Sequence, residues 1–213
     1  MQGINSIKQK EFMKRIYFTL IIIGAISFNG CIKNDPVIWN GSVVELDAAI
    51  WNANGAGLTY PILTRIPAAN RALTTSCPDS TLRRYPQTIR VRVNLVGAQL
   101  GKDISVSYEL FTSPITTVAF PATVSAGCTT PQTPSAAAAT LTVSDAVAGT
   151  HFTTLSGTAV IPANSSFGYI DIPILNPGPT AGAARFIGIR LKDDENVKVS
   201  ANYKEAGFVI DQR

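Results

Sequence analysis

Apolar and polar residues alternate at every second position over much of the chain, and the alternation is clearest in "QTIRVRVNLVG". The apolar positions of this stretch are Ile89, Val91, Val93 and Leu95. The polar positions between them are Arg90, Arg92 and Asn94. A period of two is typical of a strand that buries one face and exposes the other. The pattern therefore predicts a half-buried β-strand with the arginines on its exposed face.

The next stretch, "KDISVSYELF", repeats the alternation after a short connection. Its apolar series is Ile104, Val106, Tyr108 and Leu110. The intervening "GAQLG" supplies turn residues, and two alternating runs joined by a glycine-containing turn are typical of a hairpin. We expect these two strands to form a β-hairpin.

More short alternating runs follow, namely "SGTAVIP", "FGYIDIPIL", "RFIGIRL" and "AGFVIDQ". Connections rich in Gly, Pro and Asn separate them, and nothing after residue 31 sustains a helical stripe over three turns. Two earlier runs, "SVVELDAAIWN" and "YPILTRI", also predict strands, whereas the Pro-, Thr- and Ala-rich residues around 112–140 predict a loop insertion. Many short strands of this kind predict an all-β antiparallel sandwich.

The N-terminal part follows a different pattern. Two basic residues come after Met13, then an apolar run over 16–28, and then Gly30 and Cys31. The run of about 13 residues is shorter than a membrane-spanning helix needs, and the order matches a secretory signal. The block resembles a bacterial lipoprotein signal, which implies removal of residues 1–30, from a natural start at Met13, and lipidation of Cys31. The alternative is an ordinary secretory signal that leaves Cys31 as a thiol.

The signal also changes the meaning of the charge. The whole chain carries a formal charge of +4. A share of +3 lies before residue 31, from Lys8, Lys10, Lys14 and Arg15 against Glu11. The remaining chain therefore carries only +1, which does not supply the concentrated basic surface that a nucleic-acid partner requires.

Two cysteines follow Cys31, namely Cys77 and Cys128. An exported chain reaches an oxidising compartment, where a pair of cysteines in loop-like surroundings can form a disulfide. Closing a loop of about 50 residues would stabilise the fold by roughly 4 kcal/mol. Two free buried thiols are the alternative. A metal site on these cysteines is not expected, because there is no Cys-x-x-Cys spacing and His151 is the only histidine.

From about Gln87 to Asp211 the succession of motifs resembles a Calx-beta domain, which is a seven-stranded Ig-like sandwich. The matching stretches are "IRVRVNL", "ISVSYEL", "AVAGTHFTTLSGTAVIPANSSFGYIDIPIL", "RFIGIRLKD" and "AGFVID". The resemblance implies a Calx-beta-like domain over 87–213, preceded by a lipidated N-terminus and strand extension over 31–86. "VIWNGSVVELDAAIWN" and "LTYPILTRIP" resemble uncharacterised Bacteroidetes surface lipoproteins that often accompany starch-utilisation-type uptake systems.

Some Calx-beta domains bind calcium through acidic residues at one end of the sandwich. In this chain, Asn176 and Pro177 stand where the resemblance places an acidic pair, and Gln212 follows Asp211 in the last pair. A local acidic cluster remains in the residues Asp193, Asp194 and Glu195. Calcium takes six to eight oxygen ligands, so this cluster is a candidate calcium site. Consecutive carboxylates in a solvated turn are the simpler interpretation.

His151 in "GTHF" is the one candidate general base that stands out. No nucleophile or carboxylate accompanies it at a recognisable spacing, so a structural role with hydrogen bonds to neighbouring backbone is the stronger interpretation. Serine hydrolase signatures, phosphate-cradling glycine loops and a glycosidase carboxylate pair are missing. We therefore do not expect an enzyme.

Exposed aromatic side chains are the other route to function, because sugar rings stack on them. Trp39 and Trp51 flank the first predicted strand, and Tyr60 begins the next. They are candidates for a ligand-binding platform, with packing in the core or at an edge as the alternative. Taken together, the sequence predicts a non-catalytic lipoprotein of the outer membrane, displayed on the cell surface, that acts as a binding or scaffold accessory near a nutrient-uptake system, with glycans as the candidate ligand. A calcium-dependent adhesion module is the alternative.

Overall fold

The computed structural model of the chain describes residues 41–47, 54–65, 81–120, 137–195 and 197–213. Residues Asn40–Arg213 form one compact unit. Strands, and no helices, make up the regular structure of the described residues. The strands are β1 Val43–Leu46, β2 Ile62–Leu63, β3 Gln87–Val96, β4 Ile104–Phe111, β5 Thr117–Phe120, β6 Ala139–Asp145, β7 Thr158–Ile161, β8 Phe167–Ile174, β9 Ala183–Leu191, β10 Lys198–Val199 and β11 Glu205–Asp211.

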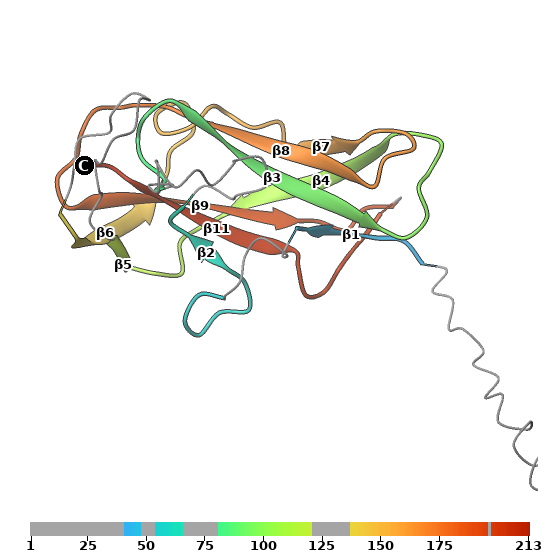
Figure 1. The fold of residues 1–213 in the computed structure, drawn as a ribbon, viewed down its shortest axis with the longest axis horizontal. Helices are drawn as coiled ribbons and strands as arrows, with labels where there is room; N and C mark the ends of the chain where they lie inside the picture. The colour runs from blue at the N-terminus through green and yellow to red at the C-terminus, as the bar shows by residue number, and fades with distance from the viewer. Residues whose placement is uncertain (1–40, 48–53, 66–80, 121–136, 196) are drawn as a thin grey trace, which may run out of the picture. The chain divides into compact units, whose positions relative to one another are not determined.

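The strands form two sheets, and the predicted all-β sandwich is confirmed (Figure 1). The smaller sheet has the order β10-β1-β3-β8. The larger sheet runs β2-β11-β9-β4-β7, with β6 pairing β9 and β5 pairing β6. Most pairs are antiparallel as predicted, but β1 with β10, β2 with β11 and β6 with β9 are parallel. The sheets of the sandwich are therefore mixed.

The main core lies between the two sheets, because each sheet turns its apolar series inward. The predicted series of β3 is buried, with Ile89, Val91 and Val93 completely inaccessible. Strand β8 contributes Ile170 and Ile172 to the same core. Burying side chains of this size is the main source of stability in such a sandwich.

The predicted hairpin of the first two alternating runs is wrong. Strand β3 pairs with β1 and β8, whereas β4 pairs with β7 and β9 in the other sheet. Figure 1 shows β3 crossing over β4 rather than lying beside it. Both strands carry an apolar face, and these faces are buried against each other when the connection crosses from one sheet to the other. Leu110, the last residue of the predicted apolar series of β4, is 45% exposed.

One other segment differs from the pattern-based expectation, whereas the two strands predicted in the N-terminal extension are present in part. Within the predicted loop 112–140 the structure has strand β5, and β6 begins at its end. The predicted strand extension supplies β1, which pairs with β3 in the smaller sheet, and β2, which pairs with β11 in the larger one. Short strands such as these give a weak local signal, because most of their stabilisation comes from the neighbouring strands.

A second apolar cluster lies on the other side of the larger sheet. It contains Phe120, Leu141, Val143, Ala184, Phe186 and Val209. Strand β9 therefore buries both of its faces, with Ile187 and Ile189 in the main core and Phe186 in the second cluster. Across the described ranges, no helix is long and apolar enough to pass through a bilayer.

Candidate functional site

The outer face of the smaller sheet brings arginines and aromatic rings together. The outward residues of β3 are paired in register with those of β8. The pairs are Arg90 with Asp171, Arg92 with Tyr169 and Asn94 with Phe167. Side chains directly opposite or diagonal to one another on one sheet face interact. We call this set of six residues the β3–β8 face.

Strand β1 extends the β3–β8 face on the side of β3. Glu45 is paired with Asn94, and the backbone N–H of Asp47 donates to the carbonyl oxygen of Arg92 at 3.0 Å. A carboxylate therefore stands beside each of these two β3 residues. Burial raises the pKa of Glu45 above its ordinary value and the Asp47 carboxylate adds to this, while a hydrogen bond with Ser200 lowers it.

One end of the face carries an ion pair with two hydrogen bonds between Arg90 and Asp171. The guanidinium of Arg90 donates from Nε and Nη2 to the two carboxylate oxygens of Asp171, at 2.7 and 2.8 Å. The same guanidinium lies over the ring of Tyr169, 4.9 Å from its centroid. Two parallel bonds fix both the position and the plane of the group. Arg90 is thus oriented by Asp171.

At the other end of the face, the guanidinium of Arg92 has fewer and weaker contacts than that of Arg90. The guanidinium of Arg92 lies 4.2 Å from the centroid of the Phe167 ring. Its Nη1 is 3.9 Å from Oδ2 of Asp47, which is at the limit of an ion pair. In the described part of the chain, the buried Nε of Arg92 and the buried Oδ1 of Asn94 have no hydrogen-bond partner. An unsatisfied buried polar group costs about 1–3 kcal/mol, so this end carries unused hydrogen-bonding capacity.

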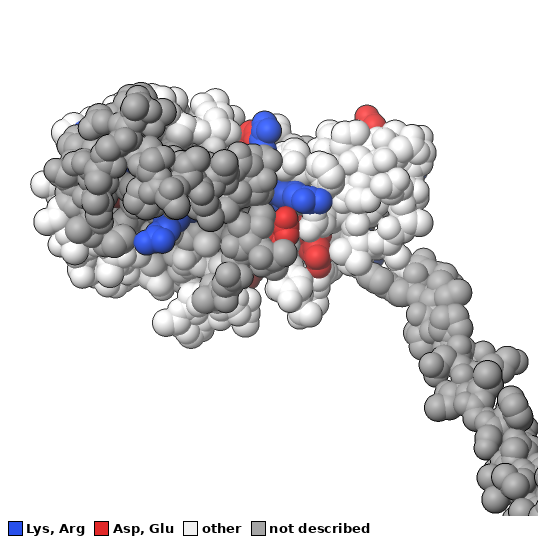
Figure 2. Space-filling model, viewed as in Figure 1, with Lys and Arg blue, Asp and Glu red and all other residues white. Residues whose placement is uncertain are grey.

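The aromatic rings of the face also contact each other. The Phe167 and Tyr169 rings meet edge to face with centroids 5.6 Å apart, and Phe167 is 37% exposed. In the middle of the view in Figure 2, basic and acidic side chains lie next to one another, with a largely uncharged surface beside them. Arg90, Asp171 and Phe167 of the face are exposed and its other three residues are half-buried, so the face combines apolar rings with donors and acceptors, which is the composition of ligand-binding surfaces.

Tyr60 lies away from the β3–β8 face. Its ring contacts that of Phe111 edge to face at 5.4 Å, and Phe111 contacts Phe186 at 5.7 Å. Burial raises the pKa of the Tyr60 hydroxyl, and the nearby Glu205 carboxylate raises it further. Tyr60 is therefore half-buried in a chain of packed rings at the second apolar cluster. Trp39 and Trp51, the other two predicted platform residues, lie outside the described residues.

The acidic run over 193–195 is a turn whose carboxylates bind backbone. Oδ1 of Asp193 accepts from the N–H of Val199 at 2.7 Å, and Oδ1 of Asp194 accepts from that of Val197 at 2.9 Å. Glu195 is exposed. No group of three or more metal-ligating side chains occurs within the described ranges. One carboxylate oxygen of Asp193 and one of Asp194 thus accept from backbone N–H groups that follow in the chain.

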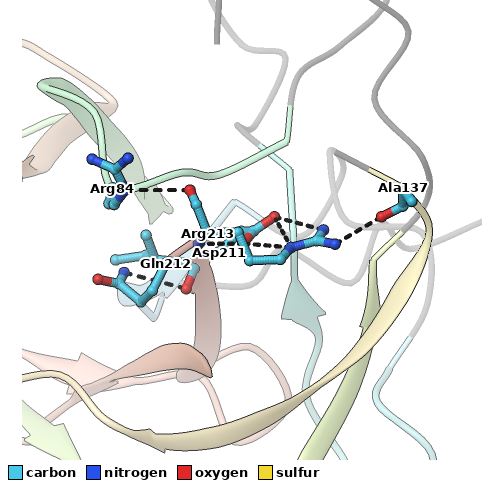
Figure 3. A network of polar contacts seen from close by, with 6 residues as sticks. Arg84, Ala137, Asp211, Gln212 and Arg213 are labelled. Carbon is cyan, nitrogen blue, oxygen red and sulfur yellow. Dashed lines mark hydrogen bonds and ion pairs between the residues drawn. The ribbon is translucent and has the colours of Figure 1, made fainter. Parts of the chain in front are cut away.

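The positions that the resemblance associates with calcium are in contact with arginines. Arg84 donates from Nη1 to Oδ1 of Asn176 at 2.7 Å, and from Nε to the carbonyl oxygen of Arg213 at 3.2 Å. Arg213 in turn donates from Nε and Nη2 to the carboxylate of Asp211, and from Nη1 to the carbonyl oxygen of Ala137 (Figure 3). Guanidinium groups thus provide the positive charge at this end of the sandwich.

His151 is buried and takes part in local backbone hydrogen bonds. Its Nδ1 accepts from the N–H of Val147 at 3.0 Å, so the proton of the neutral ring is on Nε2. Burial lowers its pKa, and the positive charge of Arg185 lowers it further. Among the carboxylates that the structure describes, none forms a hydrogen bond or ion pair with His151. These contacts are those expected of a structural histidine.

Strands β4 and β6 pair with different parts of β9, and a pocket of about 150 Å³ lies between these two pairings. Its lining includes Phe111, Phe152, Phe186 and Asp145. Oδ1 of Asp145 already accepts from the N–H of Ser113 at 2.7 Å. The pocket lining that the structure describes therefore offers a single carboxylate and no second group for acid–base chemistry.

Cys31, Cys77 and Cys128 lie outside the described residues, so lipidation and the disulfide stay predictions. The residues of the β3–β8 face were not predicted as a site. Their signal is present in "FGYID", where an aromatic residue occupies two successive outward positions of a strand. The pairing with Arg90 and Arg92 is not visible in the local pattern.

No protein-family model matches the chain, and no curated protein matches it. Solved structures with a related arrangement include the apo form of the Calx CBD1 domain, at 19% identity and a TM-score of 0.36, covering 58% of this chain and 80% of that one. A "putative carbohydrate binding protein" from Bacteroides ovatus is 11% identical with a TM-score of 0.37, covering 60% of this chain and 32% of that one. A two-domain protein of unknown function from Bacteroides fragilis is 10% identical with a TM-score of 0.40, covering 81% and 46% respectively. Similarities this low carry no information about function.

Proposed function

We propose that this protein is a non-catalytic, lipid-anchored surface protein that binds glycans through the β3–β8 face. The observation that carries the proposal is the register that sets Phe167 and Tyr169 beside Arg92 and Arg90 on an exposed sheet. Aromatic rings provide apolar contact area, and planar guanidinium groups provide donors with fixed geometry. An open sheet face suits a polymer that extends beyond one binding site.

The proposal is tested by affinity electrophoresis in native gels that contain a polysaccharide, with the full chain purified in detergent. The double variant Phe167→Ala/Tyr169→Ala should lose its retardation while keeping its melting temperature within a few degrees. Tyr203→Ala is the matched control, because this aromatic residue is 48% exposed and follows β10. Equal retardation of the double variant and the wild type would refute the proposal.

A non-catalytic role is part of the proposal. His151 is engaged with backbone, and Asp145 in the pocket has no described partner for acid–base work. A binding protein needs neither a nucleophile nor a general base. Release of reducing sugar from any retained polysaccharide by the purified protein would contradict this part.

Attachment to the outer membrane rests on the pattern that ends at Cys31. We expect Cys31→Ser to shift the protein from the membrane fraction to the soluble fraction of the envelope, with loss of the lipid mass in mass spectrometry. Retention in the membrane at the wild-type level would refute the lipid anchor. The resemblance of the N-terminal segment to lipoproteins of uptake systems supports an outer-membrane uptake complex as a partner, which co-purification from crosslinked envelopes would test.

A further inference from the structure

We propose that the ligand-contacting part of the β3–β8 face is its Arg92 end, together with Glu45, and that this subsite accepts an uncharged sugar ring. This rests on the proposed glycan-binding function and adds to it the location of the subsite and the class of the glycan. Glu45, Asn94 and Phe167 form one row across β1, β3 and β8, and Arg92 lies diagonally over the Phe167 ring.

The two arginine–aromatic pairs of the face differ in how fully they are satisfied. Arg90 uses two of its nitrogens in bonds of 2.7 and 2.8 Å to Asp171. Arg92 has one contact of 3.9 Å to Asp47, and its Nε has no partner among the described residues. The guanidinium of Arg90 is therefore held in place, whereas that of Arg92 is held mainly by the Phe167 ring and retains donors for another molecule.

Displacement of Arg92 would make three kinds of group available at one point. The face of the Phe167 ring, now covered by the guanidinium at 4.2 Å, would become accessible to the C–H groups of a sugar. The donors of Arg92 and the unpartnered Oδ1 of Asn94 would become accessible as well. A sugar hydroxyl donates one hydrogen bond and accepts others, so neighbouring hydroxyls on one ring can satisfy both groups.

The charges around this row favour a neutral ligand. Glu45 is the β1 member of the row and Asp47 lies beside it on the same strand side, while Asp171 offsets Arg90 at the far end of the face. A uronate or sulfate would approach these carboxylates and find the guanidinium of Arg92 as its one partner that no short ion pair occupies among the described residues of the face. Like charges at short range oppose binding and so give specificity. An uncharged ring avoids this repulsion and keeps the hydrogen bonds.

The test is affinity electrophoresis of the full chain in native gels that contain soluble starch, xyloglucan or galactomannan, against polygalacturonate or alginate. At least one neutral gel should retard the protein, with little change when sodium chloride is added. Asn94→Ala, Arg92→Gln and Phe167→Ala should each raise the dissociation constant about tenfold, the effect of roughly one well-made interaction. Arg90→Gln should weaken binding less than Arg92→Gln does.

Arg190→Gln is the matched control, because Arg190 lies over the ring of Phe111 at 5.0 Å on the other sheet. Retardation by the acidic gels alone, abolished by salt, would overturn the inference and leave the proposed glycan binding intact. Equal losses for Arg90→Gln and Arg92→Gln would overturn the location of the subsite. No retardation in any of the gels would overturn the proposed function and this inference with it.

Discussion

Gly168 of β8 lies directly against the backbone of Val160 in β7. A Cβ atom built on Gly168 would be 2.2 Å from the carbonyl oxygen of Val160 and 2.8 Å from its carbonyl carbon. These strands belong to different sheets, and the short connection over 162–166 joins them. At this point the two sheets approach each other closely, because residue 168 has no side chain.

Gly168→Ala should destabilise the sandwich, because backbone atoms cannot move aside as a flexible side chain can. We expect a loss of about 1–3 kcal/mol or more in the free energy of unfolding, measured by urea denaturation. Gly101→Ala is the control, since nothing lies within 4 Å of a Cβ at that position. If the two variants have the same stability, the close approach of β7 and β8 is not as the structure shows.

Most of the strands could be predicted because each one carries its own signal. The alternation of Ile89, Val91 and Val93 defines which side chains face inward without any knowledge of the partner strand. The strand with which each one pairs could not be predicted in the same way. The hairpin of β3 with β4 is wrong because two adjacent apolar faces can also be buried by facing each other across the core, and the local pattern is the same in both cases.

The candidate site was harder to predict for the same reason. Arg90 and Asp171 are 81 positions apart in the chain, and they meet only because β3 and β8 pair in one register. A shift by one residue would send these side chains to the other face. The sequence favoured Tyr60 by its position beside a predicted strand, but the structure shows its ring packed against Phe111.

The buried histidine should make stability depend on pH. The pKa of His151 is lowered from the ordinary 6.5 of the unfolded chain by burial and then by Arg185. Between the two pKa values the unfolded state binds more protons, so acidification favours unfolding. The free energy of unfolding should therefore fall as the pH drops below about 6.5 and level off once the folded protein is protonated.

His151→Asn keeps an acceptor near the position of Nδ1 but does not titrate in this range. The stability difference between wild type and variant should shrink as the pH falls below 6.5, in urea denaturation at several pH values. A difference that stays constant over this range would show that the pKa of His151 is the same in the folded and the unfolded state.

Calcium should leave the stability unchanged. Within the described ranges no three or more metal-ligating side chains converge, and the arginines Arg84 and Arg213 contact Asn176 and Asp211. A ligand that binds only the folded state, present at one hundred times its dissociation constant, would raise the free energy of unfolding by about 2.7 kcal/mol. The melting temperature should be the same in millimolar calcium and in a chelator. A higher melting temperature in calcium than in the chelator would support the adhesion-module alternative.

Asp211 and Arg213 form the most deeply buried ion pair among the described residues. The Asp211 side chain is completely buried, that of Arg213 is 17% exposed, and the Nη2 to Oδ2 distance is 2.9 Å. Removing one partner of a buried pair leaves a charge without compensation and costs about 3–5 kcal/mol. We expect a loss of about 3 kcal/mol for Arg213→Met, because the backbone N–H of residue 213 still donates to the carboxylate at 2.9 Å.

The double variant Asp211→Asn/Arg213→Met tests whether the carboxylate that Arg213→Met leaves behind is an uncompensated buried charge. It removes both charges while keeping the shape of the two side chains nearly the same. Its free energy of unfolding should be higher than that of Arg213→Met alone, because no uncompensated carboxylate remains. If the double variant is instead the less stable of the two, the hydrogen bond from the backbone N–H of residue 213 is enough to compensate the Asp211 carboxylate, and the charge left by Arg213→Met is not the source of its instability.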